Sequence, residues 1–239
     1  MEYKHLDWDS SFFKIKTARI NPCYFEENNL EELLNKLKKE NYKLIYLSCD
    51  SITNISKEIL LKFNGKLVDK KTTFVFNLKA ISSKDIKSSV LIKQYDKSIP
   101  NKNLEELAIQ SGEYSRFKLD TNFSKEQFET LYKLWILNSV NKTIAEKVII
   151  YEDSNIALGL ITLGEKQGRG NIGLISVNRT AQGKGIGKLL INAAIDYSLK
   201  KNVANLEVVT QGDNKSACKF YENCGFTVEK IEYLYHFWL

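Results

Sequence analysis

Hydrophobic residues recur along the chain at the periods of helices and strands that bury one face. One predicted helix face is marked by leucines spaced three and four residues apart: Leu30, Leu33, Leu34 and Leu37. Residues 44–47 form an apolar run typical of a buried strand, and residues 73–78 alternate as a half-buried strand does. Residues 55–63 predict a second helix, which Asn64-Gly65 ends. These patterns predict a small α/β domain over residues 1–85.

Residues 80–88 are polar and rich in Ser and Lys, so we place the domain boundary there, before a second domain over residues 88–239. Ser124 and Gln127 form a capping box that predicts the start of a helix reaching residue 138. The other expected elements of this domain are a helix over 104–109 and strands over 90–94, 148–151, 157–163, 172–177, 206–210 and 233–238.

The stretch between the strand at 172–177 and the strand at 206–210 carries the strongest chemical signal. Its residues 182–188 read Gln-Gly-Lys-Gly-Ile-Gly-Lys and open an amphipathic helix. The expected apolar face of that helix is Ile186, Leu189, Leu190, Ala193 and Tyr197. Glycines leave backbone N–H groups accessible at a helix N-terminus, where anions bind, and Lys184 and Lys188 add positive charge. The stretch therefore predicts a phosphate-binding turn.

Three known types of glycine-rich turn bind phosphate groups at a helix N-terminus, and the sequence does not match two of them. A P-loop requires G-x-x-x-x-G-K-[ST], but Gln182 stands five residues before Gly187 and Leu189 follows Lys188. A dinucleotide-binding turn requires G-x-G-x-x-G, which Gly183, Gly185 and Gly187 do not supply.

The third turn is Q-x-x-G-x-G between a strand and a helix, and it resembles the pyrophosphate loop of the GNAT superfamily of acyl-CoA-dependent N-acyltransferases. A second GNAT motif lies downstream, in Asn214, Ala217, Tyr221, Gly225 and Phe226. The resemblance implies an α/β fold with a mixed sheet, the GNAT acyl-CoA N-acyltransferase fold, beside a smaller N-terminal α/β domain. It also implies acetyl-CoA as the co-substrate and no metal.

The resemblance assigns roles by position. The residues expected to bind acetyl-CoA are Ile175, Ser176, Val177, Gln182, Gly183, Lys184, Gly185, Ile186, Gly187, Lys188, Asn214, Ala217 and Tyr221. The backbone N–H near Val177 or Ser176 is expected to stabilise the oxyanion, and Tyr221 to donate a proton to the departing sulfur. The general base stays unassigned among Glu207, His236 and an ordered chain of water molecules.

A second resemblance, over a longer part of the chain, indicates the acceptor substrate. The stretches LDWDSSFFKIKTARI, LVDKKTTFVF, GEYSRFKLD, VVTQGDN and YHFWL are similar to bacterial TDP-fucosamine acetyltransferases. That branch implies a TDP-linked amino-dideoxy sugar as acceptor, a homodimer, and a place in cell-surface glycan synthesis. Arg116 suits a diphosphate, and Tyr114 or Phe117 suits stacking on thymine, although a surface arginine beside core aromatics is the alternative. The other acceptor candidates are Asp69, Lys71, Thr210 and Gln211.

The composition of the chain limits the kinds of partner, cellular location and metal or disulfide chemistry that we expect. The formal net charge of +6 suits polyanionic small ligands, but no basic stripe with interleaved aromatics indicates nucleic acid. No apolar run approaches the roughly 18 residues of a membrane span, and the N-terminus lacks the features of a signal peptide. Four scattered cysteines indicate neither disulfides nor a zinc site. We therefore expect a cytoplasmic enzyme without membrane or nucleic-acid partners. The alternatives are a GNAT enzyme for another small amine or a peptide N-terminus, and a non-catalytic acyl-CoA-binding module.

Overall fold

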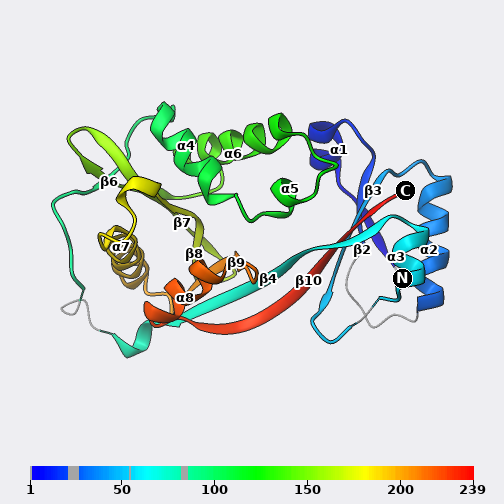
Figure 1. Ribbon diagram of the computed structural model, residues 1–239. Helices are drawn as coiled ribbons and strands as arrows, with labels where there is room; N and C mark the ends of the chain where they lie inside the picture. Colours follow the sequence, from blue (N-terminus) through cyan, green and yellow to red (C-terminus); the bar gives the residue numbers. More distant parts are fainter. Residues whose placement is uncertain (1, 21–26, 54, 82–85) are drawn as a thin grey trace. The chain divides into compact units, whose positions relative to one another are not determined.

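The computed structural model describes residues 2–20, 27–53, 55–81 and 86–239 (Figure 1). Cys23 and part of the predicted boundary segment, residues 82–85, lie outside the described residues. Two compact units divide the chain, and neither is continuous in sequence. The first comprises residues 1–72, 211–213 and 230–239, and the second comprises residues 73–210 and 214–229.

The first unit is an α/β unit that ends with the C-terminus of the chain. Its elements are β1 (Tyr3–His5), α1 (Asp7–Phe13), β2 (Thr17–Ile20), α2 (Glu27–Lys39), β3 (Leu44–Asp50), α3 (Lys57–Lys62) and parts of β4 (Gly65–Asn77) and β10 (Thr227–Trp238). The strand order is β1-β2-β3-β10-β4. Its core contains the four predicted leucines of α2, which are buried against Ile45 and Leu47 of β3 and Phe237 of β10.

This division differs from the predicted domains 1–85 and 88–239. The chain passes into the second unit at Thr73, within β4, and residues 230–239 belong to the first unit. The physical reason is long-range pairing, because Glu232–Trp238 of β10 pair antiparallel with Leu44–Asp50 of β3. A boundary placed by local polarity does not detect such pairing.

The second unit contains the rest of β4 and β10 and all remaining elements. These are η1 (Leu78–Ala80), β5 (Ile92–Gln94), α4 (Lys102–Ser111), α5 (Arg116–Leu119), α6 (Lys125–Val140), β6 (Lys147–Asp153), β7 (Ile156–Lys166), β8 (Arg169–Val177), η3 (Arg179–Ala181), α7 (Ile186–Lys200), β9 (Asn205–Gln211) and α8 (Lys215–Asn223). The strand order is β4-β9-β8-β7-β6-β5. Pairing is antiparallel from β5 to β8 and parallel between β8 and β9, so the predicted mixed α/β sheet is confirmed.

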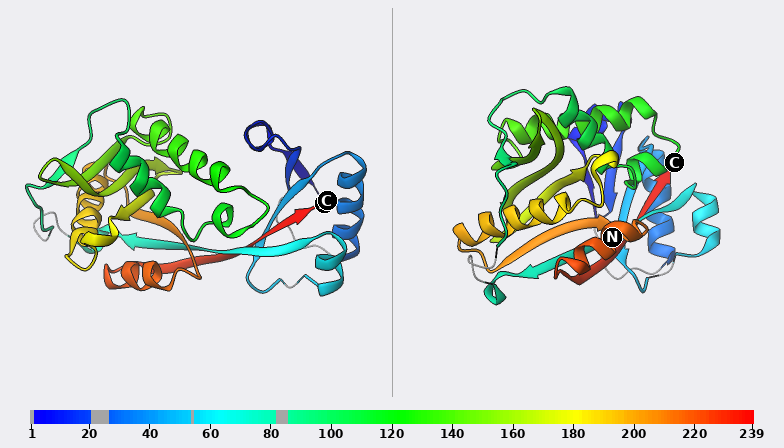
Figure 2. Two further views of the ribbon diagram at one scale, coloured as in Figure 1. Left: turned by 45° about the horizontal axis from the view of Figure 1, so that its top comes forward. Right: turned by 60° about the vertical axis from the view of Figure 1, so that its left-hand side comes forward.

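Helices cover both faces of this sheet. The right-hand view of Figure 2 shows α4 and α6 on one side of β6–β8 and α7 on the other. The predicted capping box is present at the start of α6, where Ser124 and Gln127 exchange side-chain and backbone hydrogen bonds. None of the helices in the described ranges is both long and apolar enough to cross a membrane.

The buried face of α7 is displaced from the predicted one. Ile186, Leu190 and Tyr197 are buried as expected, but Leu189 and Ala193 are only partly buried. Four further residues complete the buried face: Ile191, Ala194, Ile195 and Ser198. A helix that packs across several strands buries a wider stripe than the single row read from the sequence.

Candidate active site

Two parallel strands separate at the centre of the second unit. β8 pairs with β9 only from Gly170, opposite Leu206, to Ile172, opposite Val208. Beyond this point β8 continues to Val177 and β9 to Gln211 without pairing with each other. The end of β8 therefore presents an edge that no neighbouring strand covers on the β9 side. The two strands are therefore splayed at this end.

A β-bulge lies where the strands separate. The register between β7 and β8 shifts between Ile161 and Leu163, so that Gly173 and Leu174 stand opposite Thr162. The Thr162 hydroxyl accepts a hydrogen bond from the Leu174 N–H at 2.8 Å. At Gly173, a Cβ atom would lie 2.8 Å from Thr162 Oγ1, so a larger residue would displace this hydroxyl.

The bulge sets the direction of the backbone groups that follow. The Asn178 N–H donates to the Leu158 carbonyl, and Val177 stands opposite Gly159. Because N–H groups alternate in direction along a strand, those of Ile175 and Val177 point away from β7, toward the splayed edge. The predicted oxyanion donor, the Val177 N–H, therefore lies on the open edge, whereas the Ser176 N–H points toward β7.

The glycine-rich turn follows β8 and opens α7 at Ile186. Gly183 and Gly185 have φ angles of 76° and 80°, in the left-handed region that other residues adopt at a cost. A Cβ atom on either glycine would meet no atom within 4 Å, so the space above the turn is open. The N–H groups of the first turn of α7 lack intrahelical acceptors, and Lys188 is exposed beside them. The turn has the geometry of an anion site.

These elements enclose a cavity of about 930 Å³ within the second unit. Twelve predicted acetyl-CoA residues line it: Ile175, Ser176, Val177, Gln182, Gly183, Gly185, Ile186, Gly187, Lys188, Asn214, Ala217 and Tyr221. Lys184, which was also predicted, is exposed and does not line the cavity.

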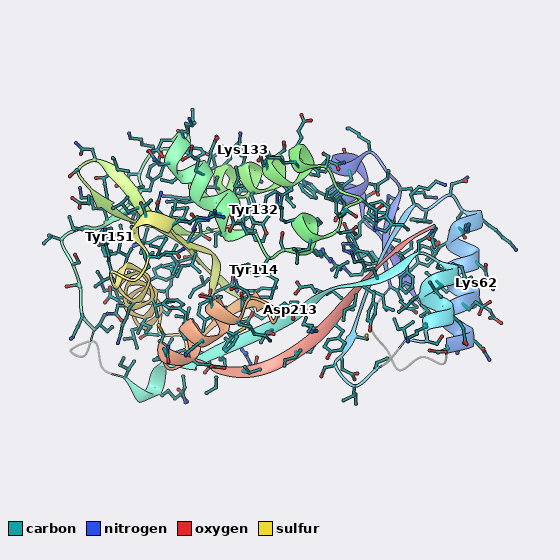
Figure 3. The ribbon with its side chains drawn as sticks, viewed as in Figure 1. Lys62, Tyr114, Tyr132, Lys133, Tyr151 and Asp213 are labelled. Atoms are coloured by element: carbon teal, nitrogen blue, oxygen red, sulfur yellow. The ribbon has the colours of Figure 1, made fainter. Side chains whose placement is uncertain are left out.

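Of the predicted acceptor residues, Tyr114 alone lines this cavity, and its side chain is labelled in Figure 3. Arg116 begins the short helix α5 rather than lying in a loop, and its guanidinium lies 4.6 Å from the Phe117 ring centre. Phe117 packs edge-on against Phe123, as in the alternative reading of this segment. The remaining candidates are not part of the cavity lining: Asp69, Lys71, Thr210 and Gln211.

Tyr221 lies on α8 with only 3% of its surface exposed. Its ring contacts Phe74, Phe220 and Phe226. Burial raises the pKa of the Tyr221 phenol far above its ordinary value, so the group keeps its proton at neutral pH. A protonated phenol at the cavity wall is a competent proton donor.

Asn214 precedes α8 and accepts the Ala217 N–H at 3.1 Å, so it is the N-cap of this helix. It also lines the cavity, and capping does not exclude contact with a ligand. Ala217, Phe220 and Tyr221 of α8 line the cavity, as does Cys224, which caps the C-terminal end of this helix. Their spacing of three and four residues is a sequence signal that identifies the whole face once Tyr221 is placed.

Neither base candidate named from the sequence reaches the cavity. Glu207 lies opposite Asn171 in the paired part of β9, and its carboxylate is 3.6 Å from Arg169. His236 is fully buried in the first unit, where its ring lies 4.9 Å from the Tyr46 ring, centre to centre, in a tilted arrangement. Among the described lining residues the one carboxylate is Glu113, which forms an ion pair with Arg179.

Sequence reasoning missed the part of the lining that comes from α4 and the segment after it: Gln110, Ser111 and Glu113. The predicted helix ended at Ile109, whereas α4 continues to Ser111. No local pattern distinguishes these polar residues from an ordinary solvated helix end. Within the described residues, no group of three or more His, Cys, Asp and Glu side chains is arranged to hold a metal ion.

Comparison with known proteins identifies the family. The model of the acetyltransferase (GNAT) family matches residues 105–226, which is more than half of the chain. This range includes β8, the glycine-rich turn and α8. The chain belongs to the GNAT acetyltransferase family.

The individual proteins that this chain resembles share only low sequence identity with it, over part of its length. The spore coat polysaccharide biosynthesis protein SpsD of Bacillus subtilis is 26% identical over 133 residues, 56% of this chain and 46% of SpsD. The mycothiol acetyltransferase of Renibacterium salmoninarum is 32% identical over 71 residues, 30% of this chain and 21% of that protein. The chain thus spans less than half the length of either relative.

A solved GCN5-related N-acetyltransferase from Sphaerobacter thermophilus has a similar fold. It superposes with a TM-score of 0.57 at 14% identity, covering 98% of this chain and 75% of the other. At that identity the similarity concerns the fold alone.

Proposed function

We propose that this protein is an acetyl-CoA-dependent N-acetyltransferase that acetylates the amine of a nucleotide-linked, TDP-type amino-dideoxy sugar. The observation that carries the proposal is one cavity lined by the free edge of β8, the N-terminus of α7 and the protonated Tyr221. Membership in the GNAT family, whose enzymes use acetyl-CoA, supports the same reaction type.

The cavity residues fit the acyl donor. Gly183 and Gly185 leave open space where a β-carbon would project, and the first N–H groups of α7 face it with Lys188 nearby. These groups would hold the pyrophosphate. The free edge of β8 would align the extended arm, as an added strand aligns on a sheet edge.

The reaction forms one bond and breaks another. The amine nitrogen bonds to the thioester carbonyl carbon, the C–S bond breaks, the amine loses a proton and the sulfur gains one. The Val177 N–H would stabilise negative charge on the carbonyl oxygen, and Tyr221 would supply the proton to sulfur. Glu113 is the described lining carboxylate available to attract a cationic amine, but its ion pair with Arg179 must open first.

The acceptor class rests on two weaker supports. One is the resemblance of several stretches, spread over nearly the whole chain, to TDP-fucosamine acetyltransferases, and the other is the 26% identity over 133 residues to a protein named for polysaccharide biosynthesis. Tyr114, exposed at the cavity, is the described aromatic placed to stack on a base. A cytoplasmic homodimer acting in cell-surface glycan synthesis remains part of this proposal.

A GNAT enzyme for a different small amine is the second candidate. The 32% identity to mycothiol acetyltransferase supports it, since that relative is not named for a nucleotide sugar. The two candidates share the donor site and differ only in the acceptor.

A thiol-release assay with acetyl-CoA separates the candidates. The panel holds TDP- and UDP-linked 4-amino and 3-amino sugars, a free amino sugar, an aminoglycoside and a short peptide. We expect turnover with a TDP-linked amino sugar. Turnover only with another amine would discard the acceptor class, and acetyl-CoA binding without any turnover would favour a non-catalytic module.

A further inference from the structure

The side chain of Gln110, on α4, forms hydrogen bonds to the end of β8. Its Nε2 atom donates to the Val177 carbonyl at 2.7 Å and to the Ser176 hydroxyl at 3.0 Å. Gln182, from the glycine-rich turn, donates to the same Val177 carbonyl at 3.1 Å. Two amide groups from different elements therefore meet on one backbone oxygen.

That oxygen belongs to the splayed edge. Val177 directs its carbonyl to the same side as its N–H, away from β7, because both groups of a residue share a direction along a strand. In a continuous sheet the next strand would supply a donor, but β9 has separated by this point. Gln110 and Gln182 replace the missing strand and occupy both lone pairs of the oxygen.

Capping this carbonyl changes the electrostatics of the edge. An uncapped carbonyl oxygen beside the Val177 N–H would repel the negative charge that develops on a thioester oxygen bound there. With two donors on this carbonyl, the Val177 position offers a ligand its N–H alone, and the Val177–Asn178 peptide group is held by Gln110, Gln182 and the Leu158 carbonyl. Preorganised donors of this kind cost no reorganisation during reaction.

Gln110 is itself rigidly placed. Leu104, Leu107 and Ala108 bury the apolar side of α4, and the helix ends at Gly112 against the ring of Tyr132, which Figure 3 labels. A Cβ atom at Gly112 would lie 2.2 Å from Tyr132 Cζ, so only glycine permits this approach. The last turn of α4, with Gln110, is thereby fixed relative to α6.

We infer that Gln110 is a positioning residue for acyl transfer: it caps the Val177 carbonyl, which faces the same side as the Val177 N–H, and so leaves that N–H as the group that the strand end presents to the thioester carbonyl of the donor. This inference rests on the proposed function, and it adds a residue from α4 to a site otherwise built from β8, α7 and α8.

The test uses Gln110→Met, which keeps length and apolar bulk but removes both donors, and Gln110→Glu, which keeps shape but presents a carboxylate without donors. Gln94→Met is the matched control, because Gln94 is exposed on β5 and its Nε2 atom donates to Asp96. The primary readout is the carbonyl stretch of bound acetyl-CoA labelled with ¹³C at the thioester carbon, measured by isotope-edited infrared difference spectroscopy. It requires no acceptor.

In the wild type and in Gln94→Met we expect binding to lower the stretching frequency, since a hydrogen bond polarises the carbonyl. In both Gln110 variants this lowering should shrink while the Kd for acetyl-CoA stays within about twofold. With the acceptor that the thiol-release assay selects, kcat should fall about 10- to 100-fold and the KM for acetyl-CoA should change little, because a transition-state interaction is lost.

If Gln110→Met binds acetyl-CoA with an unchanged frequency shift, the positioning role is overturned. If the wild type does not bind acetyl-CoA at all, the proposed function itself is rejected, and that result is recognised before any variant is compared.

Discussion

The Thr162 hydroxyl on β7 accepts a hydrogen bond from the Leu174 N–H on β8, and both groups are buried. In a regular ladder this N–H would bind a backbone carbonyl, but the bulge removes that partner. The side chain of Thr162 therefore satisfies a backbone donor that the bulge would leave without an acceptor. This bond supports the strand end that carries Val177.

Replacing Thr162 with Val should lower the free energy of unfolding by about 1–3 kcal/mol. The two side chains have the same shape, but Val leaves the Leu174 N–H buried and unsatisfied. Urea unfolding monitored by circular dichroism measures the change.

Thr162→Ser is the control, because it keeps the hydroxyl and loses a methyl group. Hydrogen exchange at the Leu174 amide separates the two variants: exchange should accelerate in Thr162→Val and not in Thr162→Ser. Equal protection in both would mean that the hydroxyl does not stabilise the bulge.

Sequence patterns predicted those features of the second unit that are determined by residues close together in the sequence. The capping box at Ser124 and the glycine-rich turn before α7 both depend on residues within a few positions of one another. The bulge could not be predicted, because Gly173 and Thr162 become partners only through pairing of β7 with β8. The role of Gln110 could not be predicted for the same reason, because its hydrogen-bond partners lie 66 and 67 residues away in sequence.

The compact units do not coincide with the predicted domains for a related reason. Tyr46 of β3 stands opposite His236 of β10, and this pairing brings the last residues of the chain into the first unit. Sequence alone showed an aromatic strand at the end of the chain but not the strand with which it pairs.

Gly183→Ala should weaken the binding of CoA about tenfold, which corresponds to ~1.4 kcal/mol. The added methyl group projects into the open space above the turn and raises the cost of the φ angle of 76°. Isothermal titration calorimetry measures the Kd.

Gly168→Ala is a matched control for this substitution. Gly168 has a φ angle of 74°, also meets no atom within 4 Å of a built Cβ, and lies in the turn between β7 and β8. Both variants should lose about 1–2 kcal/mol of stability from the left-handed conformation, whereas CoA affinity should fall only for Gly183→Ala. A parallel loss of affinity in Gly168→Ala would trace the effect to stability rather than to the turn.

Tyr221→Phe should reduce kcat by about 100-fold, in the range of lost acid catalysis, with little change in the KM for acetyl-CoA. The phenyl ring keeps the contacts with Phe74 and Phe226, so the change isolates the hydroxyl. Steady-state thiol release with the best acceptor measures both constants, and unchanged turnover would reject the proton-donor role.

The protein should lose stability steeply above about pH 10. Burial raises the pKa of the phenols of Tyr197 and Tyr221, and for Tyr197 the hydrogen bond to Glu146 at 2.6 Å raises its pKa further. In the unfolded chain these phenols ionise near pH 10, so the unfolded state loses its protons first. Their contribution to stability is therefore complete below about pH 10 and is lost as the pH rises toward the folded-state pKa values. Urea midpoints measured from pH 7 to 11 should fall in the alkaline range, and Tyr197→Phe should flatten that fall. A wild-type midpoint that is constant up to pH 11 would show that these phenols are not protected from ionisation by the fold.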